Sequence, residues 1–118
     1  MFQSPQSLER IQDVEILLRQ WWRLLQDLLP FKEILFGSET KDWGSIADGD
    51  EEAEEVTVTG AALGDFVLAS MSIDVADLQL SADVTAANTI TCVLSNSTGG
   101  AVDLGSGTLS VMVIKTQK

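Results

Sequence analysis

An unbroken stripe of apolar residues near the N-terminus constrains the fold of this chain more than any other feature. The stripe alternates spacings of three and four residues over six positions: Ile11, Val14, Leu18, Trp21, Leu25 and Leu28. A repeat of about 3.5 residues places all six on one side of a helix, which is the pattern of a coiled-coil seam. Leu17, Trp22 and Leu24 widen the stripe. We therefore predict a helix that is buried on more than one side by partner helices.

The ends of this helix carry recognisable signals. Ser4 followed by Pro5 is typical of a first helical turn, and Pro30 disfavours helical geometry at the residue before it. We therefore predict an N-terminal oligomerisation helix within residues 1–29, with a homotrimer favoured. One alternative is that the stripe folds back onto the rest of its own chain. A membrane-lying helix is disfavoured, because acidic residues offset the arginines on the polar side.

Residues 30–55 have no clear period and are predicted to form a connector. Its apolar cluster, Phe31, Ile34, Leu35 and Phe36, is expected to include one helical turn and to dock on a partner protein. The run from Asp48 to Glu55 then places six acids in eight residues, which indicates a solvated charged loop.

From residue 56 to 118 the apolar residues alternate with a period of two, and this β domain could begin as early as residue 42. The alternation is clearest around Val56, at Phe66–Leu68, at Leu78 and Leu80, from Ile90 to Leu94 and from Leu109 to Val113. Turn-forming residues separate these segments, and no helical pattern intervenes. The chain is therefore predicted to be mainly β, with an N-terminal helix followed by a small antiparallel β-sandwich or barrel.

Charge is distributed unevenly along the chain, whose net charge is -11. Residues 42–118 hold twelve acidic residues but only Lys115 and Lys118 as bases. A surface of this kind disfavours binding to nucleic acid or to an anionic membrane, since both require clustered cations. Neither a signal peptide nor an apolar run of the roughly 20 residues needed to span a bilayer is evident. The sequence thus predicts a soluble protein made in the host cytoplasm.

Catalytic chemistry is disfavoured by the residue types. The chain has no histidine and a single cysteine, Cys92, which lies in an apolar β pattern and is predicted to be buried. Asp48, Asp50 and Glu52 resemble the start of a calcium loop but lack the later glycine and glutamate of an EF-hand. Asn96-Ser97-Thr98 matches a glycosylation pattern, but a hairpin turn is the favoured interpretation. We expect no cofactor, no metal site and no enzyme activity.

Several segments taken together resemble a known group of proteins. These are Trp43–Ala47, the stretch Val56–Asp65 (VTVTGAALGD), Ala86–Thr91 and Gly107–Val111, in that order. The combination resembles a small β domain of virion proteins of tailed bacteriophages. The resemblance implies a β-sandwich used in capsid decoration proteins, head fibres or tail appendages, commonly as trimers and with no catalytic residues. The acidic run from Asp48 to Glu55 departs from that pattern.

On this basis the expected function is a homotrimeric capsid decoration or cement protein on the virion. It would dock on the major capsid protein or on another virion protein. The alternative is a tail-fibre, tail or baseplate component that could bind a receptor or glycan. A glycan-binding tip requires exposed aromatic residues on the β domain, for which Trp43 and Phe66 are the candidates.

Overall fold

The structure is a computed structural model that describes the backbone of residues 5–28 and 31–116. Side chains are described for residues 13–25, 27–28 and 32–116. The chain divides into two compact units, one containing helix α1 (Pro5–Leu28) and the other spanning Glu33–Thr116. Each unit is an independent body in the description that follows.

Helix α1 confirms the predicted N-terminal helix. It runs for 24 residues and ends at Leu28, where the approach of Pro30 predicts an end. Leu29 and Pro30 lie outside the described residues. Leu29 is the last residue of the predicted oligomerisation segment.

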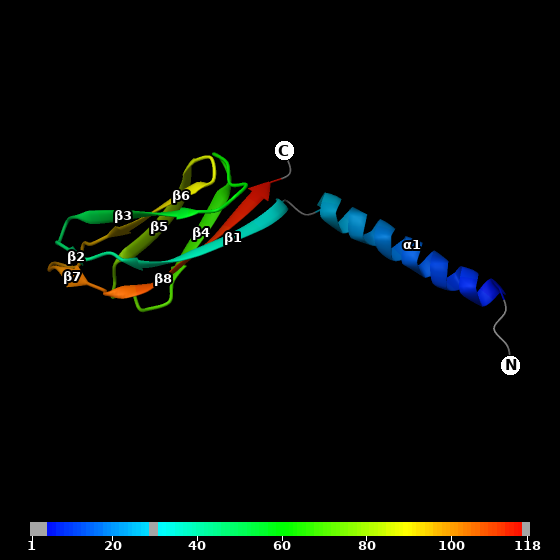
Figure 1. The fold of residues 1–118 in the computed structure, drawn as a ribbon, viewed down its shortest axis with the longest axis horizontal. Coiled ribbons are helices and arrows are strands. Elements are labelled where there is room, and N and C mark those ends of the chain that lie inside the picture. The colour runs from blue at the N-terminus through cyan, green and yellow to red at the C-terminus, as the bar shows by residue number, and fades with distance from the viewer. Residues whose placement is uncertain (1–4, 29–30, 117–118) are drawn as a thin grey trace. The chain divides into compact units, whose positions relative to one another are not determined.

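Eight strands make up the second unit, and the chain is mainly β as predicted (Figure 1). The strands are β1 (Phe31–Asp42), β2 (Ser45–Ile46), β3 (Glu51–Thr57), β4 (Phe66–Met71), β5 (Gln79–Ala86), β6 (Thr89–Ser95), β7 (Val102–Asp103) and β8 (Ser106–Thr116). They form two three-stranded sheets, β1-β8-β4 and β3-β6-β5, and the short pair β2-β7. The end of β8 lies beside the start of β1, so these neighbours are antiparallel (Figure 1).

The core lies between the two larger sheets, which together form the predicted small β-sandwich. Along β6, Ile90, Cys92 and Leu94 are fully buried, and along β8 Leu109 and Val113 are as well. These residues alternate with more exposed ones, because successive side chains of a strand point to opposite faces. Trp43, Ile46, Val56, Val58, Ala61, Leu78, Val84 and Val111 complete the buried cluster.

The edges of the two sheets also approach each other. A Cβ on Gly37 of β1 would lie 2.6 Å from Cγ2 of Val58, so only glycine allows β1 to come this close. The carboxylate of Glu39 accepts a hydrogen bond from the Thr57 amide at 3.0 Å, and Lys41 forms an ion pair with Glu54 at 3.6 Å. At the other side, β4 lies against β5. The sandwich is therefore partly closed, in the manner of a flattened barrel.

The predicted connector over 30–55 was wrong, because most of it is strand. Residues 31–42, expected to be irregular with one helical turn, form β1 on sheet β1-β8-β4, and Glu51–Glu55 of the predicted loop lie in β3. The β unit thus begins near Glu33 rather than at residue 56 or 42. The period of two was hidden in β1 by the consecutive apolar residues Ile34, Leu35 and Phe36. In β3 the period of two was hidden because glutamates occupy both faces of the strand. This segment is a strand through its pairing with β6, which is distant in the sequence.

Asn96 joins three segments at one end of the sandwich. Its side-chain amide donates to the carbonyl oxygens of Ile46 at 2.7 Å and Gly100 at 2.8 Å, and its Oδ1 accepts from the amide and hydroxyl of Thr98. Asn96 is 2% exposed. Asn96-Ser97-Thr98 lies in the loop after β6, but the predicted hairpin turn is wrong, because β6 pairs with β3 and β5 whereas the next strand, β7, pairs with β2. In the fold the Asn96 amide is occupied by structural hydrogen bonds.

We predict that Asn96→Ala strongly destabilises the β unit. The change leaves the Ile46 carbonyl and the Thr98 amide without their partner, and each buried unpaired group costs about 1–3 kcal/mol. For a domain of this size we expect the melting temperature to fall by more than about 10 °C, measured by circular dichroism. Ser97→Ala, at the exposed neighbouring position, is the control and should change it little. An unchanged melting temperature for Asn96→Ala would contradict this role.

Candidate functional site: apolar assembly surfaces

The two lysines of the β unit are engaged in structural contacts. Its bases between Glu33 and Thr116 are Lys41 and Lys115. Lys41 pairs with Glu39 and Glu54, and Lys115 donates to Asp65 at 2.6 Å and to the Gly60 carbonyl. The hydrogen bond from Lys115 holds the pKa of the Asp65 carboxyl below its ordinary value. Both cations are therefore neutralised locally, and the remaining surface of the unit is acidic.

The candidate calcium residues do not converge. Among the described residues, no three His, Cys, Asp or Glu side chains are grouped so as to hold a metal ion. Asp48 instead accepts a hydrogen bond from the Gly99 amide at 2.9 Å, which closes the loop between β2 and β3 onto the loop after β6.

Cys92 is buried in the core, as its apolar surroundings in the sequence predict. Burial raises the pKa of the Cys92 thiol to about 11, with only partial compensation from the charge of Lys41. Because the thiolate is the reactive form, this cysteine is a packing residue in the folded chain.

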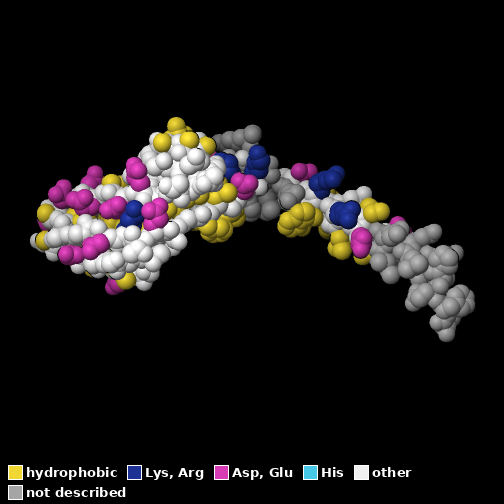
Figure 2. Space-filling view, viewed as in Figure 1, with side chains coloured by type: hydrophobic (Ala, Val, Ile, Leu, Met, Phe, Trp, Pro, Cys, Tyr) yellow, Lys and Arg dark blue, Asp and Glu magenta, His cyan; other side chains and the backbone are white. Residues whose placement is uncertain are grey.

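The predicted oligomerisation residues form one broad apolar surface on α1, which we call the helix stripe. Its described members are Val14, Leu17, Leu18, Trp21, Trp22, Leu24, Leu25 and Leu28, and their exposed fractions range from 48% for Leu25 to 79% for Leu28. At 3.6 residues per turn they share one side of the helix, and the hydrophobic side chains are visible along it in Figure 2. The side chain of Ile11, the first predicted member, lies outside the described residues.

The opposite side of α1 is polar. Asp13, Glu15, Arg19, Gln20, Arg23 and Asp27 lie there, with Ile16 as its one apolar member among the described side chains. The spacing of four residues from Glu15 to Arg19 and from Arg23 to Asp27 suits ion pairs along the helix surface. The helix is thus amphipathic, with an unusually large apolar share for a surface in contact with water.

The predicted docking cluster is divided by strand alternation. Ile34 and Phe36 are exposed on the outer face of β1, whereas Leu35 points to the opposite side and packs against the core. Leu35 is therefore a core residue and not a docking residue. The side chain of Phe31 lies outside the described residues.

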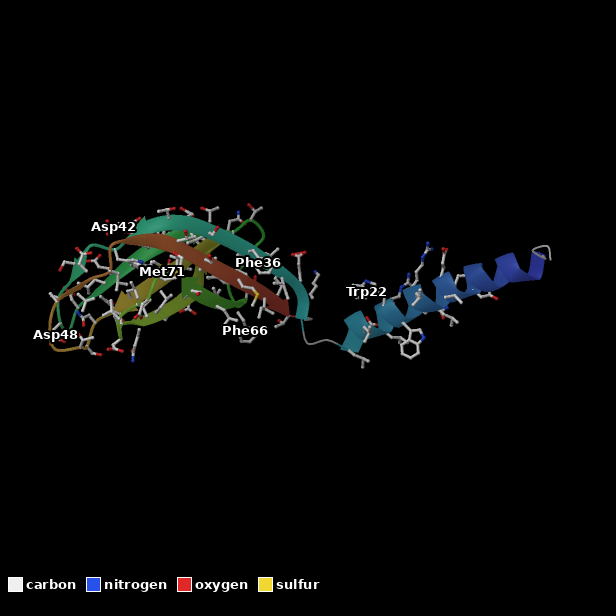
Figure 3. All side chains as sticks on the ribbon, turned by 90° about the horizontal axis from the view of Figure 1, so that it is seen from below. Trp22, Phe36, Asp42, Asp48, Phe66 and Met71 are labelled. Carbon is white, nitrogen blue, oxygen red and sulfur yellow. The ribbon has the colours of Figure 1, made fainter. Side chains whose placement is uncertain are left out.

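Neighbouring strands add apolar residues to the same outer face. In the register of β4 and β8, Phe66 pairs with Ile114 and Leu68 with Met112. These side chains alternate with Val67, Ala69, Val111 and Val113, which pack into the core, so they point outward. With Ile34 and Phe36 they form what we call the apolar sheet face, and Figure 3 shows Phe36 and Phe66 at the same end of the sandwich.

The sequence singled out Phe66 only as an exposed aromatic for a glycan-binding tip, and three other members of this face were missed, namely Leu68, Met112 and Ile114. The available signal was the continuous apolar run, Phe66–Ala69 and Val111–Ile114, in place of a strict alternation with polar residues. Such runs are typical of strands covered on both faces. Their meeting on one surface depends on the pairing of β4 with β8, which local sequence does not specify.

The outer face of the other sheet is polar by contrast. Along β3-β6-β5 one row consists of Glu55, Thr91 and Asp83, and Thr85 and Thr91 share a hydrogen bond at 2.6 Å. The two outer faces of the sandwich therefore differ sharply in chemistry. Trp43, expected as an exposed aromatic, is instead buried in the core. Of the two candidates, Phe66 alone is exposed.

No protein-family model matches the sequence, and no curated protein matches it. Among the described residues, no helix is both long enough and apolar enough to cross a membrane.

We predict that Cys92 resists thiol reagents in the folded protein. At pH 8, well below its pKa of about 11, the thiol stays protonated and buried, so reaction with a chromogenic disulfide should be slower by at least about a hundredfold than in denaturant. The measurement is the rate of thiol release with and without guanidinium. Rapid modification of the native protein would contradict the burial of Cys92.

Proposed function

We propose that this chain is a non-catalytic assembly protein, in which α1 holds several copies together and the β unit is displayed. The observation that carries the proposal is the helix stripe, whose eight described members are all about half exposed or more. Full burial of one such side chain is worth about 1.5–3 kcal/mol, so the stripe holds a large driving force for association. Helices in proteins owe most of their stability to the packing of an apolar face rather than to intrinsic propensity.

The sequence register of α1 supports a parallel arrangement of copies. If Ile11, Leu18 and Leu25 occupy the first core position of each heptad, then Leu17 of one copy lies opposite Trp22 of its neighbour. By the same spacing of five residues, Arg10 would lie opposite Glu15. Each flanking pair is matched, either apolar with apolar or base with acid. An antiparallel pairing does not produce these matches.

The same register favours three copies over two. A two-stranded coil prefers β-branched residues at the first core position with leucine at the fourth. Ile11 and Leu28 fit this preference, but the four core positions between them do not: Leu18 and Leu25 are at the first position, and Val14 and Trp21 are at the fourth. The apolar flanking residues Leu17, Trp22 and Leu24 extend the seam toward a second neighbour. A homotrimer covers this wide surface better than a dimer.

The proposed setting is a bacteriophage virion, as a capsid decoration or cement protein bound to the major capsid protein or to another virion protein. The resemblance of Trp43–Ile114 to small β domains of tailed-phage virion proteins supports it. The acidic surface of the β unit also suits a protein present in many closely spaced copies, since like charges keep displayed domains apart. Several copies joined by α1 would bind a repeating shell with avidity.

A tail-fibre or baseplate component is the second candidate. A receptor- or glycan-binding tip would present aromatic side chains to its ligand, and the burial of Trp43 leaves Phe66 as the exposed aromatic of the two expected. Phe36 is exposed on the same face, but neither phenylalanine carries a polar group that could bind a sugar hydroxyl. The decoration function is therefore favoured over a glycan-binding tip.

The helix-mediated assembly is tested by Leu18→Asp in the full chain. A buried unpaired carboxylate in the seam is strongly unfavourable, so we expect the oligomer to dissociate to monomers by light scattering coupled to size exclusion. Ile16→Asp, an equally apolar residue on the polar side of the same helix, is the matched control and should keep the oligomer. Dissociation by both variants, or by neither, would count against the stripe as the interface.

The virion function is tested by cosedimentation with tailed-phage capsids purified without this chain. We expect saturable binding by the wild type and at least tenfold weaker binding by Leu18→Asp, because the monomer loses avidity. Ile16→Asp should bind like the wild type. An oligomeric chain that ignores capsids would exclude the decoration function while leaving self-assembly intact.

A further inference from the structure

The apolar sheet face is an exception among the outer surfaces of the β unit. A sheet with one face on the core ordinarily carries polar residues on the other, as β3-β6-β5 does with Glu55, Thr91 and Asp83. Sheet β1-β8-β4 instead carries apolar residues on both faces. Phe36, Phe66 and Leu68 are 73%, 61% and 58% exposed. Apolar residues on both faces are typical of a sheet whose two faces are both covered by other protein.

The size of the face limits what can cover it. The exposed parts of Phe36, Phe66, Leu68 and Ile34 amount to apolar area on the order of 400 Å². A specific stable interface needs about 800 Å² from each partner. The face is therefore too small to hold a separate protein by itself, but it is large enough to extend an interface that already exists.

Only a short segment of chain joins α1, which carries the proposed interface, to the apolar sheet face. Ile34 follows Leu28 by six residues, a span of at most about 20 Å when fully extended. Parallel helices pack about 8–10 Å apart, so the sheet faces of copies joined through α1 remain close to one another. A short tether of this kind gives an effective concentration in the millimolar range. For the apolar sheet face of one copy, the partner at the highest effective concentration is thus the same face of a neighbouring copy.

The distribution of charge also favours a second copy of this chain as the partner that covers the apolar sheet face. The chain carries a net charge of -11, so most surfaces of one copy repel those of another. In the rows Phe66–Ile114 and Leu68–Met112 every side chain is uncharged, and the next row along the sheet is Ser70–Ser110. By strand alternation, the nearest charges of β1 on this face are Lys32 at its start and Asp42 at its end. Two acidic copies can approach through this face without bringing carboxylates together.

We propose that the apolar sheet face of each copy packs against the same face of neighbouring copies around the symmetry axis of the oligomer. This inference rests on the proposed self-assembly through α1 and extends it into the β unit. Each copy would then associate with its neighbours through two surfaces, the helix stripe and the apolar sheet face.

The first test is Leu68→Glu in the full chain, with Leu63→Glu as matched control. Leu63 is as exposed as Leu68 but lies in the turn before β4, outside the apolar sheet face. We expect Leu68→Glu to raise the concentration at which the oligomer half-dissociates by at least about tenfold, measured by analytical ultracentrifugation. Leu63→Glu should leave it within about twofold of the wild type. Equal behaviour of the two variants would overturn the proposal.

A second test does not depend on a disruptive substitution. Ser70→Cys places a thiol on the outer face of β4 beside the apolar rows, and Ser81→Cys places one on the outer face of β5. Because Cys92 is buried and protonated, the introduced thiol is the one that a short bismaleimide reaches. We expect covalent dimers in most chains for Ser70→Cys and few for Ser81→Cys. Absence of crosslinks at residue 70, or equal crosslinking at both positions, would overturn the proposal.

The outcomes separate this inference from the function on which it rests. If Leu18→Asp dissociates the oligomer but Leu68→Glu does not weaken it and Ser70→Cys does not crosslink, self-assembly stands and the sheet face has another occupant. Loss of capsid binding in Leu68→Glu with an unchanged oligomer would identify that occupant as the shell protein. A wild-type chain that is monomeric would instead overturn the proposed self-assembly itself.

Discussion

Side chains from β6 and β8 meet in the middle of the sandwich, and their burial determines where the other strands lie. Ile90, Cys92 and Leu94 face the core from one sheet, and Leu109 and Val113 face it from the other. Each of these two strands is the centre of its sheet, with neighbours on both sides. The core also explains the unreactive character predicted for Cys92, which is part of this packing. A small β unit has little surface to bury, so its central strands must supply most of the stabilisation.

The strands that the sequence predicts are those with a strict period of two. The alternation of β6, and of β8 from Thr108 to Val111, is visible locally because buried residues alternate there with more exposed ones. Strand β1 could not be found in this way, since Ile34, Leu35 and Phe36 are all apolar and Leu35 alone of the three packs against the core. In β3 the run Glu51–Glu55 has the composition of a loop, and it becomes a strand through its register with β6. Non-local pairing overrides local preference at both places.

The two candidate surfaces also differ in how far local sequence predicts them. The helix stripe follows from one short segment, because the helical period brings residues together that are near in sequence. The apolar sheet face combines residues from β1, β4 and β8, which are separated by up to about eighty positions. It therefore required the sheet order and the register before its members could be recognised. For Trp43 the prediction was wrong in the opposite sense. This aromatic residue was expected to be exposed, but it lies in the core.

The approach of β1 to β3, made possible by Gly37 and held by Glu39 and Lys41, has a consequence for a crowded protein. A free strand edge offers unpaired amides and carbonyls to any neighbouring strand, and fibrils grow by this addition. Here the Thr57 amide already has a carboxylate partner, and β4 lies against β5 at the other side. Copies held at high local density would then meet through side chains rather than through backbone. Ordered assembly and protection from amyloid-like growth would thus depend on the same closed edges.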